Sequence, residues 1–64
     1  MALKLTVPSM KSEDVAQLIV ETIKTTEPDA KVDVNLDANT ITIESAASEE
    51  TMKQLIIATG HPIA

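Results

Sequence analysis

Apolar and polar residues alternate with two different periods along this chain of 64 residues. A period of two predicts strands with one buried face at residues 3–7, 31–36 and 40–44. A helical period predicts one helix after Ser12 and a second after Ser48. Residues 61–64 have room only for a short last strand. The chain therefore reads strand, helix, strand, strand, helix, strand.

Capping and turn residues mark the ends of these elements. Ser12 and Ser48 are good N-cap residues, and each is followed by two carboxylates that favour the positive end of the helix dipole. Pro28 should end the first helix near residue 25 or 26, and Gly60 should end the second. Residues 37–39, Asp-Ala-Asn, suit a tight hairpin loop because Asp and Asn tolerate positive φ.

The predicted order of elements falls into two similar halves. It predicts an α+β fold of the ferredoxin-like βαββαβ type, a sandwich in which two helices cover one face of a four-stranded antiparallel sheet. The length allows one small domain, residues 1–64. The core must be built from aliphatic side chains and methionine, because the chain has no aromatic residue and no cysteine.

Charge and hydropathy argue against nucleic acids and the membrane interior as binding partners. Ten acidic residues face five lysines, for a net charge of −5, so the basic surface that nucleic-acid binding requires is missing. The longest apolar stretch, residues 55–58, is far shorter than the ~20 residues that span a bilayer. The first residues lack the apolar block of a signal peptide. We expect a cytoplasmic monomer that does not insert into membranes.

Three segments resemble the heavy-metal-associated domain family, and most closely its small cyanobacterial copper metallochaperones. They are Leu-Thr-Val-Pro at residues 5–8, Ile-Thr-Ile at residues 41–43 and Ala-Thr-Gly-His at residues 58–61. The likeness extends over essentially the whole chain. It implies a βαββαβ fold that carries Cu(I) to partner proteins, commonly the cytosolic domain of a copper-transporting P-type ATPase.

The chain departs from the family at its metal-binding motif, Met-x-Cys-x-x-Cys. Met10 matches the methionine, but Ser12 and Val15 stand at the two cysteine positions. Cu(I) prefers soft thiolate ligands, whereas a serine hydroxyl is a hard, weak donor and valine donates nothing. Ser12 is better explained as a helix cap and Val15 as an apolar contact, and neither is expected to bind metal. The pairing of Ser with Val favours natural divergence over an engineered replacement.

Two residues remain as candidate metal ligands, His61 and Met10. A neutral imidazole is a good ligand for copper or zinc, and a thioether is a soft donor for Cu(I). In the resembling chaperones the position of His61 approaches the metal site. The alternatives are a solvated loop histidine and a methionine that fills the core. Together the two side chains could make only a weak Cu(I) site, and no other cofactor is expected.

No catalytic arrangement is recognisable, and we do not expect an enzyme. Glu13 and Asp14 with Ser12 could suggest a site for Ca²⁺ or Mg²⁺, but such sites need six or more oxygen ligands, and helix-start carboxylates explain these residues better. As an acid–base pair they fail, because adjacent residues on a helix do not face each other. One glycine cannot form a Gly-rich phosphate loop.

Two main functions follow. The first is a chaperone-related domain whose metal binding is lost or strongly weakened but which family partners still recognise. The second is a metal-independent interaction or regulatory module on the same fold. In both, residues 9–14 and 60–62 would contact the partner, and the carboxylates of Glu13 and Asp14 would favour a lysine-rich one. A third interpretation, an unrelated ferredoxin-like domain that binds a small molecule, is disfavoured by the end-to-end resemblance.

Overall fold

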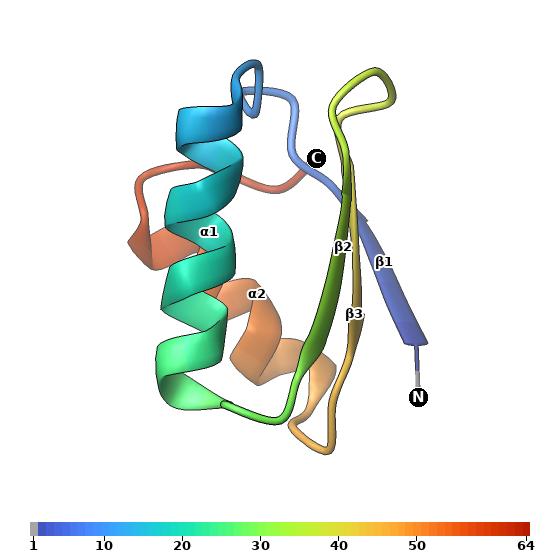
Figure 1. Cartoon of the computed structure of the whole chain (residues 1–64), viewed down its shortest axis with the longest axis vertical. Coiled ribbons are helices and arrows are strands. Elements are labelled where there is room, and N and C mark those ends of the chain that lie inside the picture. Colours follow the sequence, from blue (N-terminus) through green and yellow to red (C-terminus); the bar gives the residue numbers. More distant parts are fainter. Residues whose placement is uncertain (1) are drawn as a thin grey trace.

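The computed structural model describes residues 2–64, in which two helices pack on one face of an antiparallel sheet (Figure 1). The strands are β1 (Ala2–Thr6), β2 (Lys31–Asn35) and β3 (Thr40–Glu44), and the helices are α1 (Glu13–Thr26) and α2 (Glu49–Ala58). The three strands and the first helix lie within one residue of the predicted bounds, and α2 ends two residues before Gly60. Within residues 2–64, none of the helices has the length and hydropathy needed to cross a membrane.

The sheet has the order β1-β3-β2, with β3 antiparallel to both neighbours. Leu5 pairs with Ile41 on one side of β3, and Val34 pairs with Ile41 on the other. This register places the apolar residues of all three strands on the face that the helices cover. The ferredoxin-like α+β class predicted from the sequence is therefore present.

The prediction of four strands is wrong for the described residues, which form three. The segment after Gly60 lies beside the end of β1, where the Ala64 N–H donates to the Thr6 carbonyl at 3.0 Å. One hydrogen bond is too few for a ladder, and Pro62 has no N–H to donate another. Ile63 still packs against the core as a partly buried residue.

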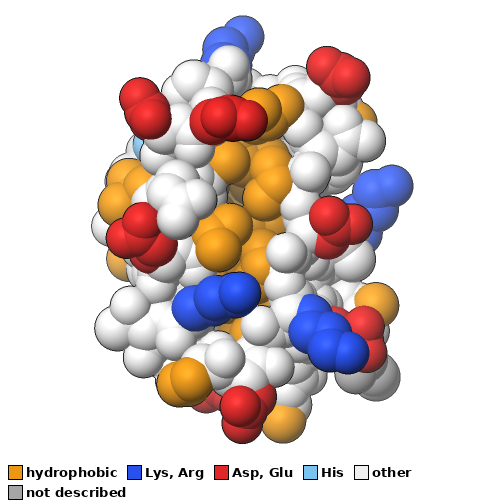
Figure 2. Space-filling view, viewed as in Figure 1, with side chains coloured by type: hydrophobic (Ala, Val, Ile, Leu, Met, Phe, Trp, Pro, Cys, Tyr) orange, Lys and Arg blue, Asp and Glu red, His pale blue; other side chains and the backbone are white. Residues whose placement is uncertain are grey.

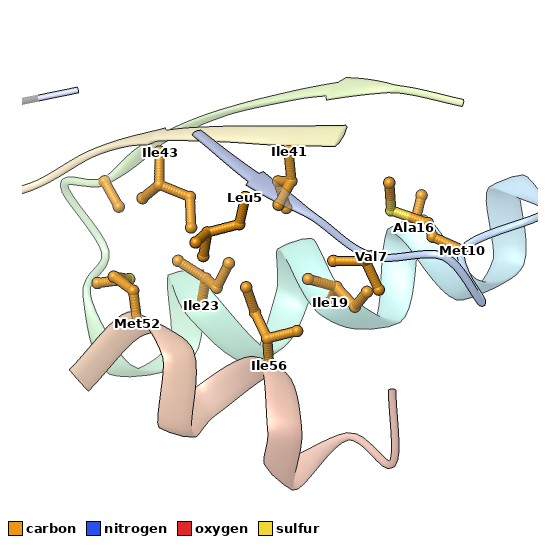
Figure 3. Packing of buried hydrophobic residues seen from close by; sticks show 11 residues of the cluster. Leu5, Val7, Met10, Ala16, Ile19, Ile23, Ile41, Ile43, Met52 and Ile56 are labelled. Carbon is orange, nitrogen blue, oxygen red and sulfur yellow. The ribbon is translucent and has the colours of Figure 1, made fainter. Parts of the chain in front are cut away.

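The core between sheet and helices is aliphatic, with two methionines (Figure 3). Its buried members are Leu5, Val7, Met10, Ala16, Ile19, Ile23, Ala30, Ile41, Ile43, Met52 and Ile56. The predicted inward residues of β2, Val32 and Val34, are only partly buried. Both lie on β2, one of the two edge strands of the sheet.

Candidate functional site

The loop between β1 and α1 is folded back on itself and buries Met10. The Met10 N–H donates to the Val7 carbonyl at 3.0 Å, which closes a tight turn around Pro8 and Ser9. The Met10 side chain is fully buried and belongs to the core cluster (Figure 3). This placement favours the packing interpretation of Met10, because a metal ion delivered from solvent would have to reach a thioether inside the core.

Asn39, at the tip of the β2–β3 hairpin, holds this loop in place. Its amide Nδ2 donates to the carbonyls of Met10 at 2.9 Å and Pro8 at 3.2 Å. Its own carbonyl accepts from the Val7 N–H at 2.7 Å. Asn39 has a φ of 56°, the left-handed conformation that Asn tolerates better than most residues. The hairpin tip and the β1–α1 loop are therefore one hydrogen-bonded unit.

Ser12 and Val15 both have structural roles at the start of α1. Ser12 is the N-cap, and its Oγ accepts from the Val15 N–H at 3.4 Å while its carbonyl accepts from Ala16 at 3.1 Å. The Val15 side chain is partly buried and packs against the core. At this helix start Ser12 offers a hydroxyl, which is a hard and weak donor for Cu(I), and Val15 offers no donor atom.

His61 lies against the same loop, as the family resemblance implies. Gly60, with a φ of 91°, ends α2 and turns the chain so that His61 Nδ1 lies 2.8 Å from Ser9 Oγ. One imidazole nitrogen is therefore engaged with Ser9, which leaves Nε2 as the free donor atom. His61 is half-buried. It lies beside the loop that contains Met10, and its hydrogen-bond partner there is Ser9, which is not a candidate metal ligand.

The remaining polar groups of this end do not assemble a cation site. Glu13 and Asp14 are exposed in the first turn of α1, and the one ion pair found in residues 2–64 joins Glu49 to Lys53 elsewhere. Across that same part of the chain, no three His, Cys, Asp or Glu side chains cluster closely enough to hold a metal ion. Glu13 and Asp14 thus give this end of the molecule a negative charge that the described part of the chain does not neutralise by ion pairing.

Sequence reasoning missed the roles of Ser9 and Asn39. The sequence identifies Asn39 only as a turn residue, although its amide makes the bonds that fix the loop. The signal available was its tolerance of positive φ, which says nothing about acceptors 29 and 31 residues away. Ser9 likewise has no local pattern that points to His61.

Comparison with solved structures finds similar folds over nearly the whole chain. The copper chaperone Atx1 from Synechocystis PCC6803, in its Cu2 form, is 31% identical, with a TM-score of 0.92 over 97% of this chain and 98% of that one. The cyanobacterial copper metallochaperone ScAtx1 in solution is 31% identical over 100% of both chains, with a TM-score of 0.84. A gold binding protein, at 20% identity and a TM-score of 0.90 over 94% of this chain and 92% of that one, shares the fold. The sequence matches no protein-family model and no curated protein.

Proposed function

Because this chain belongs to the family of Atx1-type copper chaperones with the heavy-metal-associated fold, we propose that it keeps the family's scaffold and protein-docking end but no longer carries copper on thiolates. Metal binding is lost or strongly weakened. The observation that carries this proposal is the use of Ser12 as a helix cap and of Val15 as a core contact in a chain without cysteine.

The chemistry of Cu(I) supports the proposal. Two thiolates at a helix start bind this soft ion tightly because the helix dipole favours the thiolate form. The alcohol of Ser12 stays protonated at neutral pH and already accepts the hydrogen bond from Val15. The residual donors are the free Nε2 of His61 and the buried thioether of Met10. One reachable nitrogen is too few to retain a transported ion against a competing chelator.

A competition titration against a strong Cu(I) chelator tests this proposal. Wild-type protein should leave the copper with the chelator, whereas the double variant Ser12→Cys/Val15→Cys should take it, because the fold already supplies the helix start. Copper uptake by this variant shows that the folded scaffold and the assay can both report Cu(I) binding. Stoichiometric retention of copper by wild-type protein would contradict the proposal.

His61 is tested in the same titration under weaker competition. If wild-type protein takes up Cu(I) weakly, His61→Ala should abolish that binding. The matched control is Met10→Leu, which preserves the apolar volume of the core and removes the sulfur. Weak binding that survives His61→Ala would exclude the His61 site and leave the thioether of Met10 as the donor to test.

The partner class in this proposal is a protein, with the cytosolic domain of a copper-transporting P-type ATPase as the first candidate. The contact surface would be the docking end, defined as residues 9–14 and 60–62, where Glu13 and Asp14 favour a lysine-rich surface. Location in the cytoplasm and the absence of enzymatic activity belong to the same proposal, in agreement with the metallochaperone neighbours. A metal-independent regulatory module is the alternative.

An NMR titration with such an ATPase domain distinguishes these two. Chemical-shift changes confined to the docking end, in the absence of copper, would support recognition of the family's partner. The charge variant Glu13→Lys/Asp14→Lys should weaken that binding, and Glu49→Lys/Glu50→Lys at the start of α2 is its matched control. No shift change at any concentration would favour a different partner and hence the regulatory alternative.

A further inference from the structure

A shallow apolar groove runs between α1 and the edge strand β2, and it begins at Glu13 of the docking end (Figure 2). It has a volume of about 320 Å³ and is lined by Glu13, Ala16, Gln17, Val20, Val34 and Leu36. Val20, Val34 and Leu36 are only partly buried there. Apolar side chains of α1 and β2 are therefore partly exposed to solvent along the groove.

The backbone beside this groove has unpaired hydrogen-bonding groups. The Asn39 carbonyl, just before β3, accepts from the N–H of Val7, just after β1. Hydrogen-bonded pairs alternate along an antiparallel ladder. The odd-numbered residues of β3 therefore direct their backbone groups to β1, and the even-numbered residues direct theirs to β2. In the observed register, residues 31, 33 and 35 of β2 face those even-numbered partners. The alternation therefore directs the N–H and C=O groups of Val32 and Val34 toward the free edge.

The edge strand itself has residues of opposite charge at its two ends, because Lys31 begins β2 and Asp37 follows it. Glu13 begins α1 and Asp37 follows the end of β2, whereas Lys24 and Lys31 lie at the opposite ends of the same two elements. Because α1 and β2 run in opposite directions, the two acidic residues share one end and the two lysines share the other (Figure 1). Figure 2 shows acidic side chains beside one end of the apolar stripe and a basic side chain across the other.

We propose that this edge binds a second copy of the chain, with the two β2 strands antiparallel about a two-fold axis at Val34. In this register Lys31 lies opposite Asp37 of the second copy, and Val32 lies opposite Leu36. The backbone groups of Val34 face those of Val34 in the copy. A two-fold interface must be self-complementary, and an edge strand with Lys31 at one end and Asp37 after the other meets that condition.

Neighbouring registers fit less well. Centring the axis on Asp33 would place two Asp33 carboxylates directly opposite each other, which is destabilising. Centring it on Val32 would place Ala30 opposite Val34, but the Ala30 N–H already donates to the Glu27 carbonyl at 3.0 Å. The Val34 register also covers Leu36 of both copies. The inference uses no metal ligand and stands apart from the proposed function.

Sedimentation equilibrium of the intact chain measures this association. A small edge-to-edge interface is a weak one, so the dimer should become populated between about 10 µM and about 1 mM. Lys31→Asp and Asp37→Lys should each raise the dimer dissociation constant by about tenfold, because each replaces two attractive cross-strand pairs with repulsive ones. The double variant Lys31→Asp/Asp37→Lys should restore the wild-type constant.

The same variants distinguish the proposed pairing of Lys31 with Asp37 from simple repulsion between two negatively charged copies. Asp37→Lys lowers the magnitude of the net charge, so general repulsion alone would make that variant associate more strongly. Lys4→Asp, in β1, is the matched control and should have a smaller effect than Lys31→Asp. A chain that stays monomeric to about 1 mM would overturn the proposal. A dimer that the double variant does not restore would overturn the register.

Amide hydrogen exchange gives an independent readout of the same interface. Exchange at the Val34 N–H should slow as the protein concentration rises, because dimerisation converts a solvent-facing amide into a paired one. The Ile41 N–H lies in the central strand and should not change. Exchange at Val34 that does not depend on concentration would overturn the proposal even if a dimer forms.

Discussion

The starts of α1 and α2 share a serine cap followed by two carboxylates, but different contacts hold them. Ser48 Oγ accepts from the Thr51 N–H at 3.2 Å and bonds the Thr51 hydroxyl at 3.0 Å, so α2 is fixed by residues within its own first turn. The loop before α1 is instead fixed by Asn39, from a hairpin 29 residues away. The same local motif therefore begins two helices, but only the one in α1 follows a loop that is fixed by a contact from a distant part of the chain.

The largest effect should come from placing cysteines at both helix starts. Ser12→Cys/Val15→Cys and Ser48→Cys/Thr51→Cys introduce the same spacing, and both should raise Cu(I) affinity by many orders of magnitude over wild-type protein. The α1 pair should bind at least about tenfold more tightly, because its loop is already ordered and less freedom is lost on binding. Competition titrations measure both constants. Equal affinities would show that the ordered loop contributes nothing.

The next effect concerns the bonds that make the α1 loop different. Asn39→Ala should lower the free energy of unfolding by about 2 kcal/mol, because it removes two hydrogen bonds and puts alanine at positive φ. Ser45→Ala, which removes one local bond to the Ala47 N–H before α2, should cost about 1 kcal/mol or less. Urea unfolding provides both values.

Asn39→Gly separates the two contributions of Asn39. Glycine tolerates positive φ but lacks the amide, so this variant should recover only the part of the loss that comes from the backbone. If Asn39→Gly is as stable as wild-type protein, the side-chain hydrogen bonds do not stabilise the fold, and the contrast between the two helix starts fails.

The two caps themselves should differ more modestly. Ser48→Ala should cost about 1 kcal/mol, because it removes a bond to the Thr51 N–H and one to its hydroxyl. Ser12→Ala should cost about 0.5 kcal/mol, because its single bond to the Val15 N–H is longer, at 3.4 Å. Thermal and urea unfolding of the pair measure the difference. A larger loss for Ser12→Ala would contradict the geometry.

The smallest effect involves the ion pair present at α2. Glu49 lies 2.9 Å from Lys53, and its hydrogen bond and charge raise the pKa of the Lys53 ammonium above the ordinary lysine value. A raised pKa in the folded state means that the pair stabilises the fold below the lysine pKa of the unfolded chain. This contribution is lost as the pH rises through the pKa of the folded state. NMR titration of Lys53 in wild-type protein and in Glu49→Gln should show a lower pKa in the variant, and high salt should reduce the difference.

The elements were predictable because their signals are local. The serine caps, Pro28, Gly60 and the period-two strands each depend on residues close in sequence, and the helices and strands formed close to where those signals placed them. The fourth strand failed because pairing requires backbone donors and a partner edge, and Pro62 supplies no donor.

The site was predictable only in part, because its geometry depends on long-range contacts. The caps at Ser12 and Ser48 and the approach of His61 to the β1–α1 loop followed from spacing and resemblance. The bonds from Asn39 and the bond between Ser9 and His61 join residues 29 to 52 apart, and no periodic pattern encodes them. Metal ligation by His61 or Met10 stays a prediction that the titrations above address.

The Asn39 contacts also bear on how such a protein can change over time. The bonds that fix residues 7–10 end on backbone atoms and on the side chains of Ser9, Asn39 and His61, so none of them uses the side chain of residue 12 or 15. Substitutions at those two positions therefore leave the hydrogen bonds of residues 7–10 in place. Under the proposed function, two substitutions would be enough to exchange the chemistry of the cargo while the docking end keeps its shape.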